Sequence, residues 1–450
     1  MELKSMTMEQ LLDLGDFPCE CGKIHRPGVK RVIIEKNAVR ALPALLNQIH
    51  AEKPLLISGE STFKAGGPGV CETLELARIP YSKVILPGNP LKPVEASVGS
   101  ALMHFDYTCD AIIGIGSGVV NDIGKILARA TGRKYIIVAT APSMDGFVSA
   151  TSSMERDGLK VSLDSTAAYA VVGDLDILCE APALLLRAGL GDMIAKITSL
   201  AEWKLSHLIT GEYYCPCVAE LVQSALDKVL SHAEGILQRE PDAVSAVMEG
   251  LICAGLGMNY AGVSRPASGT EHYFSHIWDM RALAFPAADC DLHGIQAGIG
   301  TVYTLRAFEE FLKGDYDVDR RKAMNHAMCF SAEDWNARLR EYIGPGAEAM
   351  IAGEQKERKY DPEKLEKRLN AIEDKRNEIL AVISALPKSE EVIRLMASVG
   401  LPVCAEHIGC TPKDIQTVFQ MTKDIRDKYI STRLFWDLGI LDELSAKAFL

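Results

Sequence analysis

The chain contains 450 residues, of which 48% are hydrophobic and 24% charged, as in an ordinary globular protein large enough for two domains. Its formal net charge of −12 argues against a polyanionic partner such as DNA or an anionic membrane surface, although a local basic pocket could still bind a small anion. No uncharged apolar run reaches the roughly 18 residues of a membrane span, and the N-terminus carries acidic residues without a cleavage site. We therefore expect a cytoplasmic protein with reduced cysteines, no membrane span and no nucleic-acid partner.

Strands and helices are expected to alternate between residues 31 and 180. Short apolar runs typical of strands occur at residues 31–35, 54–59, 82–88, 111–116, 134–142 and 169–178. The segments between most of them show helical spacing, and residues 154–165 read as an antiparallel hairpin. Strands separated by helices of this kind predict a parallel sheet covered on both faces.

From about residue 181 the apolar residues recur every three or four positions, which is typical of helices. We therefore predict an α/β domain over residues 1–180 and an all-helical domain over residues 181–450. The highly charged segment 354–380 is expected to be helical and to form a solvated face or an arm.

A glycine-rich turn follows the apolar strand at residues 111–116. Gly114, Gly116 and Gly118 lead directly into a helix, whose N-terminal N–H groups and positive dipole end favour a pyrophosphate. The spacing is G-x-G-x-G and not the full G-x-G-x-x-G, so a tight turn without a ligand is the alternative. The next strand ends in residues 140–146, and because parallel strands share one carboxyl edge, both loops could face one nucleotide.

Three segments concentrate carboxylates and imidazoles that suit a divalent transition metal. The first lies at the start of a helix, the second places two histidines four residues apart on one helix face, and the third follows 17 residues later. The candidates are Asp192, Glu271, His272, His276, Asp291 and His293. Spacing leaves open which two histidines bind, and structural roles for most of these residues are the alternative.

The twelve cysteines include two clusters. Cys19, Cys21 and His25 form a C-x-C-x3-H group, whereas Cys215 and Cys217 form a separate C-x-C. Neither matches a standard zinc spacing, and neither has a second half nearby in the sequence. The sequence therefore favours ordinary thiols over a structural zinc site at both places.

Five motifs taken together resemble the bacterial branch of the sn-glycerol-1-phosphate dehydrogenase family. They are GIGSGVVNDIGK, TAPSMDGFVSATSS, GLGDMIAK, SGTEHYFSHIWD and LHGIQAG, and the match runs in order from about residue 15 to 310. This family belongs with the iron-type alcohol dehydrogenases, glycerol dehydrogenases and dehydroquinate synthases. The resemblance implies a Rossmann-like domain with a parallel sheet, an all-α C-terminal domain of dehydroquinate synthase type, and a cytoplasmic homo-oligomer, favoured as a dimer, that serves phospholipid metabolism.

The resemblance also implies roles for individual residues. Those matching nucleotide contacts are Gly116, Gly118, Val119, Val120, Asn121, Asp122, Thr140, Ala141, Pro142, Ser143 and Ser149. Asp192, His272 and His293 match the ligands of a divalent metal ion, zinc or nickel in this family, with iron as an alternative. Asp145 and His276 match residues that contact the substrate.

The reaction implied is reversible hydride transfer between NADH or NADPH and dihydroxyacetone phosphate, giving sn-glycerol-1-phosphate. The metal ion would polarise the ketone oxygen, while Asp145 and His276 would orient the substrate and relay the proton. Lys160, Lys196 and Arg265 are candidates for the substrate phosphate because they lie near the motifs in sequence.

One position departs from the family pattern. Gly59 stands where many members carry an acid that binds the adenosine ribose, so the choice between NAD and NADP stays open unless Glu60 substitutes. Alternative functions are a dehydroquinate synthase-like enzyme, a glycerol dehydrogenase-like enzyme and a non-catalytic binding protein of the same fold.

Overall fold

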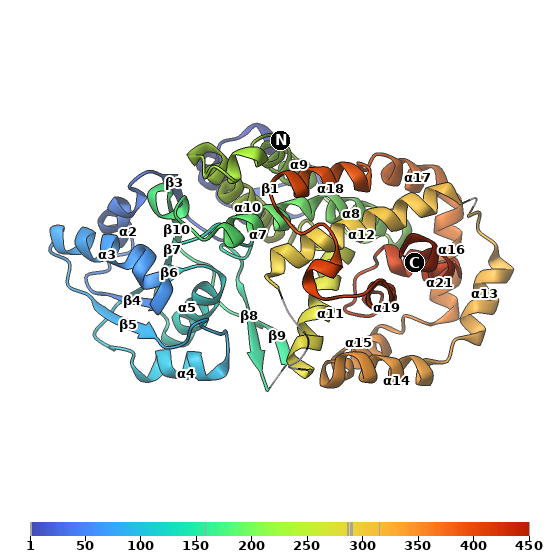
Figure 1. The fold of residues 1–450 in the computed structure, drawn as a ribbon. Helices are drawn as coiled ribbons and strands as arrows, with labels where there is room; N and C mark the ends of the chain where they lie inside the picture. The colour runs from blue at the N-terminus through green and yellow to red at the C-terminus, as the bar shows by residue number, and fades with distance from the viewer. Residues whose placement is uncertain (1, 158, 286–287, 289–290, 315, 450) are drawn as a thin grey trace. The chain divides into compact units, whose positions relative to one another are not determined.

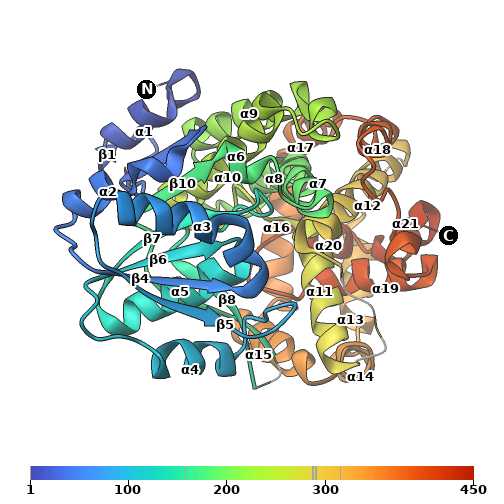
Figure 2. The ribbon, with the colours of Figure 1, turned by 60° about the vertical axis from the view of Figure 1, so that its left-hand side comes forward.

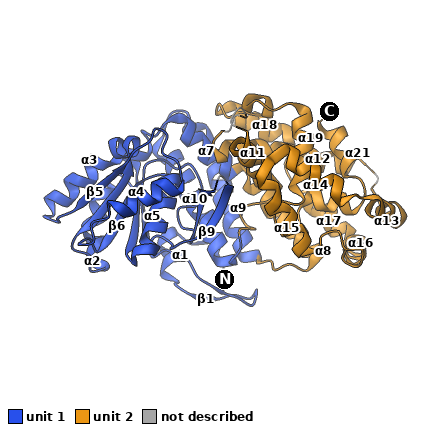
Figure 3. Cartoon of the chain, turned by 90° about the horizontal axis from the view of Figure 1, so that it is seen from below, with its two compact units in different colours: residues 1–193, 216–263 blue, residues 194–215, 264–450 orange. Residues whose placement is uncertain are grey.

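The computed structural model describes residues 2–157, 159–285, 288, 291–314 and 316–449 (Figure 1). The chain packs into two compact units, coloured separately in Figure 3. Unit 1 comprises residues 1–193 and 216–263, and unit 2 comprises residues 194–215 and 264–450. The domain limits expected at residues 180 and 181 stay a prediction.

A six-stranded sheet forms the centre of unit 1, with the strands in the order β3–β10–β7–β6–β4–β5. They are β3 (Arg31–Glu35), β4 (Pro54–Gly59), β5 (Ser82–Leu86), β6 (Ala111–Gly116), β7 (Lys134–Ala139) and β10 (Ala170–Asp174). Each neighbouring pair runs parallel, which confirms the predicted parallel sheet. The residues of β4 and β6 are buried throughout, in keeping with their largely apolar sequences.

Helices cover this sheet (Figure 2). Those of the α/β part are α2 (Leu42–Gln48), α3 (Glu60–Leu76), α4 (Glu95–Met103), α5 (Gly118–Thr131), α6 (Leu175–Leu178) and α7 (Ala183–Ile194). On one face, Leu46 of α2 and Leu74 of α3 pack with alternate strand residues such as Ile113 and Val172. On the other, Tyr135 of β7 lies so close to Gly124 of α5 that a Cβ on this glycine would come within 2.5 Å of the ring.

The order of the strands reverses between β4 and β6. From β4 the chain crosses to β5 on one side, then returns to β6 on the other side and continues to β7. In open α/β sheets, ligands bind at the carboxyl ends of the strands at such a reversal. Gly59 ends β4 and Gly116 ends β6, and the N-termini of α3 and α5 follow them. The fold thus places the glycine-rich turn where a nucleotide is expected.

Two small hairpins accompany the sheet. β8 (Thr151–Arg156) and β9 (Leu159–Asp164) pair antiparallel, which confirms the hairpin predicted there. Near the N-terminus, α1 (Met8–Asp13) is a short helix, and β1 (Phe17–Pro18) pairs with β2 (Ile24–His25) around the first cysteine cluster. The sequence gives no period-2 signal over such short strands, so the β1–β2 hairpin was not expected.

Two long helices complete unit 1, α9 (Pro216–Ser231) and α10 (Pro241–Ala261). Within the described residues, α10 is the one helix long and apolar enough to cross a membrane, but 72% of its most apolar window is buried inside the protein. A helix buried to this extent is typical of the core of a folded domain.

The described part of unit 2 contains helices and no strands, as predicted for the C-terminal part of the chain. They are α8 (Lys196–Thr210), α11 (Thr270–Ala284), α12 (His293–Lys313), α13 (Arg320–Cys329), α14 (Ala332–Ile343), α15 (Ala347–Glu357), α16 (Pro362–Asp374), α17 (Arg376–Ser384), α18 (Ser389–Ser398), α19 (Pro412–Thr422), α20 (Ser431–Asp437) and α21 (Leu441–Phe449). Helix α12 approaches α11 very closely, because Gly300 leaves room for the backbone of Glu271; a Cβ there would lie 2.5 Å from the Glu271 carbonyl oxygen.

The charged segment 354–380 packs into unit 2. It spans the end of α15, all of α16 and the start of α17, and Leu365, Leu369 and Ile372 bury one face of α16. The prediction of a solvated outer face is therefore confirmed, whereas the alternative prediction of a projecting arm is wrong.

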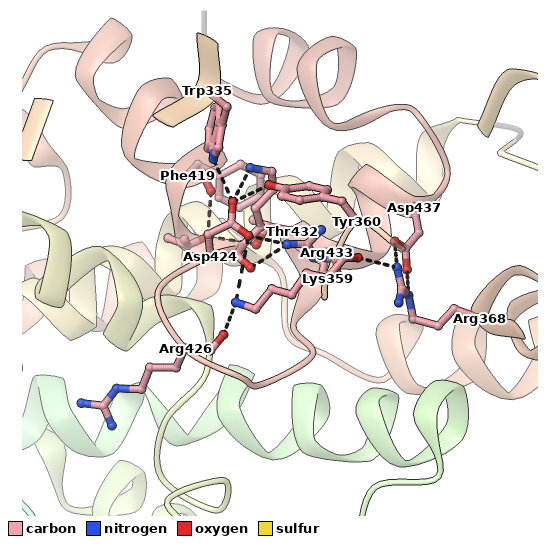
Figure 4. Close-up of polar contacts among 12 residues, drawn as sticks. Trp335, Lys359, Tyr360, Arg368, Phe419, Asp424, Arg426, Thr432, Arg433 and Asp437 are labelled. Carbon is pink, nitrogen blue, oxygen red and sulfur yellow. Dashed lines mark hydrogen bonds and ion pairs between the residues drawn. The ribbon is translucent and has the colours of Figure 1, made fainter. Parts of the chain in front are cut away.

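This segment also contributes to a buried group of charges, the Asp424 network (Figure 4). The Asp424 carboxylate accepts hydrogen bonds from Trp335, Tyr360 and Lys423, at 2.9, 2.6 and 2.7 Å, and from Arg433 at 2.5 Å. Asp424 itself is 1% exposed. The network ties residues from α14, the α15–α16 connection and α20 together.

Candidate metal and nucleotide site

The structure brings three of the predicted metal ligands together. One ligand atom from each of Asp192, His272 and His293 lies within 4.8 Å of the other two. Asp192 is on the last turn of α7, which ends at Ile194, so the expectation that it lies at the start of a helix is wrong. His272 is on the first turn of α11, and His293 begins α12. A carboxylate with two imidazoles is the donor set of catalytic metal centres that keep a coordination position for substrate.

A carboxylate holds His272 in the orientation that a ligand needs. Its Nδ1 lies 2.9 Å from Glu271 Oε1, and this carboxylate also accepts hydrogen bonds from the Gly269 N–H and the Thr198 hydroxyl. Because an ionised carboxylate only accepts, the His272 proton is on Nδ1 and the Nε2 lone pair is the one available to a metal ion.

The same reasoning fixes the tautomer of His293. Its Nδ1 lies 2.8 Å from the Ser275 hydroxyl, and that hydroxyl donates its single hydrogen to Gln296 Oε1 at 2.6 Å. Ser275 must therefore accept from His293 Nδ1–H, which again leaves Nε2 for a metal ion. Both imidazoles thus fit a divalent cation through their chemistry as well as their position.

Two buried carboxylates at the start of α11 have pKa values shifted in opposite directions. Burial raises the pKa of Glu202, and repulsion from the nearby Glu271 raises it further. Burial also works against ionisation of Glu271, but hydrogen bonds from His272, Thr198 and Gly269 outweigh it and lower the pKa of Glu271. Glu271, a ligand candidate on sequence grounds, therefore serves as the charged partner of His272.

The other candidates of the metal cluster lie outside the ligand group. The His276 ring centroid is 6.1 Å from that of His293, and the Asp145 backbone N–H donates to Asp192 Oδ2 at 3.0 Å. Asp291 accepts from the Leu292 N–H at 2.6 Å and is not one of the three clustered residues. His276 and Asp145 thus each lie beside a proposed ligand, and their roles as substrate contacts stay a prediction.

The candidate cations for binding a phosphate differ in burial and in the groups that they already contact. Arg265 is 1% exposed and forms an ion pair of 2.5 Å with Glu212, and the Lys196 ammonium donates to the Ala267 carbonyl at 3.2 Å. Lys160, on β9, is partly exposed. The Lys428 ammonium, which sequence reasoning missed, is partly buried and donates to the Ser268 carbonyl oxygen at 3.0 Å, and desolvation lowers its pKa to about 7.

The predicted nucleotide loop occupies the N-terminus of α5. Gly118, Val119 and Val120 form its first turn, where backbone N–H groups lack intrahelical acceptors. Within the described residues Ser117 provides no side-chain cap for this end; its hydroxyl instead hydrogen-bonds to that of Ser143 in the next loop. An uncapped helix N-terminus at a sheet reversal is suited to an anionic group.

The polar side chains of α5 hold the loop that follows β7. Asn121 Nδ2 donates to the Gly146 carbonyl at 3.1 Å, and Lys125 contacts the same carbonyl and the Ser149 hydroxyl, both at 3.3 Å. Asp122 pairs with Lys125 at 3.0 Å, although burial raises the pKa of this carboxyl. Asn121 and Lys125 therefore position the second loop, which also contains Thr140, Ala141 and Pro142, and Asp122 acts through Lys125.

The glycines of the loop serve different purposes. A Cβ on Gly114 would meet the Tyr135 hydroxyl at 2.2 Å, and one on Gly116 would meet Val120 Cβ at 2.5 Å, so both glycines are required by packing. A Cβ on Gly118 would meet only ordinary contact distances among the described residues, the nearest being Met144 Cγ at 3.5 Å. Packing within the protein therefore does not require a glycine at position 118.

This difference allows a clean test of the loop. Gly118→Ala is expected to preserve folding, because Ala is the better helix former, but to raise the Kd for NADH or NADPH at least about 10-fold by blocking close approach of the pyrophosphate. Fluorescence titration of the nucleotide and thermal unfolding would measure the two effects. Gly116→Ala, the matched variant, is expected to lower stability by about 1–3 kcal/mol through overpacking against Val120. Unchanged nucleotide affinity in Gly118→Ala would exclude the loop as the pyrophosphate site.

Comparisons with known proteins give a consistent result. The family model described as iron-containing alcohol dehydrogenase matches residues 33–182. Glycerol-1-phosphate dehydrogenase (NAD(P)+) of Bacillus licheniformis is 38% identical over 291 residues, covering 63% of this chain and 72% of that protein. The protein of the same name from Geobacillus stearothermophilus is 26% identical over 418 residues, covering 92% and 93%. Among solved structures, glycerol dehydrogenase from Schizosaccharomyces pombe matches with a TM-score of 0.59 at 15% identity over 93% of this chain and 90% of that one, a likeness of fold alone.

Proposed function

Because the chain belongs to the glycerol-1-phosphate dehydrogenase family, we propose that it catalyses the metal-dependent interconversion of dihydroxyacetone phosphate and sn-glycerol-1-phosphate with NAD or NADP. The observation that carries this proposal is the clustering of Asp192, His272 and His293, with both imidazoles turned to offer Nε2. A non-catalytic descendant would have no physical reason to retain this arrangement together with its buried supporting carboxylate.

Different residues of the chain would bind the nucleotide, hold the metal ion and position its ligands. The first turn of α5 binds the pyrophosphate, and the loop held by Asn121 and Lys125 lines the nucleotide. Asp192, His272 and His293 would hold a divalent ion, which would supply Lewis acidity toward the substrate oxygen, and the hydride would come from the bound nicotinamide. Glu271 and Ser275 keep the two histidines fixed, so no reorganisation is needed as charge develops on that oxygen.

Proton transfer is assigned to His276, with Asp145 as a substrate-orienting group. His276 lies on the same helix as His272, and its ring is close to that of His293. An imidazole at this position can give a proton to the forming hydroxyl and recover it from water. Asp145 is anchored through its backbone to Asp192, which ties the substrate contact to the metal ligand.

The proposed function is tested by oxidation of NADH and NADPH with dihydroxyacetone phosphate, after metal analysis of the purified protein. Zinc or nickel is the expected ion. Preference for free glycerol would favour a glycerol dehydrogenase, and NAD-requiring conversion without net NADH consumption would favour dehydroquinate synthase chemistry. Failure to bind either dinucleotide would support a non-catalytic protein.

The nucleotide preference depends on the end of β4. Gly59 carries no side chain, and Glu60 is exposed on the first turn of α3. A Cβ on Gly59 would meet Leu91 at 3.4 Å, an ordinary contact, and its backbone φ of −88° accepts any residue. Gly59→Asp is therefore expected to fold and to shift the NADH to NADPH ratio of kcat/KM at least about 10-fold toward NADH, because a carboxylate repels the 2′-phosphate. Gly59→Asn is the matched uncharged control, and an equal shift there would show that charge is not the cause.

We also propose that the protein works in the cytoplasm as a homodimer, on the strength of the family resemblance. Light scattering coupled to gel filtration measures the oligomeric state directly, and a monomer at working concentration would contradict this part of the proposal.

A further inference from the structure

The N-terminal hairpin carries a second cluster of metal-binding side chains. Cys19 and Cys21 lie in the turn between β1 and β2, and His25 ends β2. Cys215 directly precedes Pro216, the first residue of α9, so the start of that helix sets its position. One ligand atom from each of these four residues lies within 4.8 Å of the other three.

Backbone hydrogen bonds close the turn that contains Cys19 and Cys21. The Cys19 N–H donates to the Lys23 carbonyl and the Gly22 N–H donates to the Cys19 carbonyl, each at 3.0 Å. Gly22 has a φ of +85°, a left-handed conformation that glycine adopts without strain. The chain thus folds back within five residues, which brings the two thiols and the following imidazole together.

The hydrogen bond of His25 selects the nitrogen that a metal ion requires. His25 Nδ1 lies 2.7 Å from the Tyr260 carbonyl oxygen, which can only accept, so the proton is on Nδ1. The Nε2 lone pair then faces Cys21 Sγ at 3.5 Å. A tetrahedral zinc ion with Zn–S of about 2.3 Å and Zn–N of about 2.05 Å separates sulfur and nitrogen by about 3.6 Å. The observed pair already has the spacing of two ligands on one zinc ion.

The surroundings are those of a closed site. His25 and Cys215 are fully buried, and the rings of Phe17 and Tyr260 pack against the His25 ring with centroids 5.3 and 5.6 Å away. Three sulfurs and one nitrogen complete a tetrahedron and leave no position for a substrate. Soft thiolate ligands also select zinc over the harder divalent ions.

We propose that Cys19, Cys21, His25 and Cys215 bind a structural zinc ion, separate from the ion at Asp192. On binding, each thiol loses its proton to solvent, the three thiolates and His25 Nε2 coordinate the zinc, and nothing is oxidised. The ion fastens the β1–β2 hairpin to the start of α9 and, through the His25–Tyr260 hydrogen bond, to the end of α10. The site is independent of the dehydrogenase proposal, since it contains no residue assigned to catalysis.

Cobalt substitution of the full-length protein distinguishes the two metal sites. Cobalt on thiolates gives an intense sulfur-to-metal charge-transfer band in the near ultraviolet, which an Asp-His-His site cannot produce. We expect this band in the wild-type protein and in His293→Ala, and its loss in Cys21→Ser and Cys215→Ser. Zinc content should fall by about one ion per chain in each cysteine variant, and the thermal unfolding midpoint by several degrees.

Two matched controls locate the ligands. Cys217→Ser changes a thiol that contacts Cys19 but lies outside the group, and Cys329→Ser changes an exposed thiol on α13; both should keep the band and the zinc. If a cysteine variant proves insoluble, His25→Cys provides a second measurement, because a fourth thiolate should retain the zinc and strengthen the band. Absence of the thiolate band in the wild-type protein, or a disulfide among these cysteines under non-reducing mass spectrometry, would overturn the proposal.

Discussion

Replacing His293 by alanine is expected to lower kcat for dihydroxyacetone phosphate reduction at least about 1,000-fold. The variant would lose one of the three proposed ligands to an ion that would stabilise charge on the substrate oxygen. Such stabilisation contributes several kcal/mol, and about 4 kcal/mol corresponds to this factor. Steady-state oxidation of NADH or NADPH measures the rate, and metal analysis after dialysis measures retention of the ion. Nucleotide affinity should not change, because the loop at α5 is untouched.

His276→Ala provides the contrast within the same helix. Its side chain lies beside His293 but outside the ligand group, so the variant should keep its metal ion while losing about 100-fold or more in kcat/KM through the missing proton donor. Ser275→Ala should fall between the two, with metal affinity reduced about 10- to 100-fold because His293 is no longer held in its tautomer. Full activity of metal-stripped protein would remove the basis of this mechanism.

Much of the α/β part could be predicted because its sequence patterns are local. The strands β4 and β6 are buried at every position and apolar except for Ser58, since both faces of the sheet are covered, and the glycine-rich turn follows directly from β6. Local patterns could not predict which glycines packing requires. Gly116 packs against Val120, four residues away, but Gly114 packs against Tyr135 on the neighbouring strand, and sequence spacing does not reveal this contact.

Long-range partners account for what the sequence missed. The C-x-C-x3-H group has no second half nearby because its fourth member, Cys215, is 190 positions from His25. Ser275 and Gln296, which orient His293, are ordinary polar residues whose role depends on the close packing of α11 on α12. A serine next to a histidine pair in sequence is too common a pattern to predict a supporting hydrogen bond.

The charged segment 354–380 illustrates the limit of composition. Its abundance of lysine and glutamate is typical of a solvated surface, and most of these side chains are exposed. Yet Lys359 is 9% exposed and lies 4.0 Å from Asp424, and Arg368 makes two hydrogen bonds to the buried Asp437. Charges of this kind are buried only where a counter-charge from elsewhere in the chain meets them, which composition does not show.

That dependence leads to the largest stability effect we expect. Asp424→Asn should lower the free energy of unfolding of unit 2 by about 3–5 kcal/mol, because it leaves Lys423 and Arg433 buried without their carboxylate. Urea unfolding followed by tryptophan fluorescence reports on this unit, since all four tryptophans, Trp203, Trp278, Trp335 and Trp436, belong to it. Glu348→Gln at the exposed Arg340–Glu348 pair is the control and should leave the midpoint unchanged.

The contribution of Asp424 to the free energy of unfolding is expected to depend on pH. Burial alone would raise the pKa of Asp424, but Lys423, Arg433 and Lys359 hold the pKa well below its usual range. The folded state therefore binds fewer protons here than the unfolded state, so the stabilisation by Asp424 is complete above about pH 4 and is lost as the pH falls through the folded-state pKa. Burial also lowers the pKa of Lys423 to about 7, which weakens the ion pair in alkaline solution. The difference between wild type and Asp424→Asn should consequently be greatest near pH 5–6 and shrink on either side. A difference that does not vary with pH would mean that the asparagine acts by packing and not by charge.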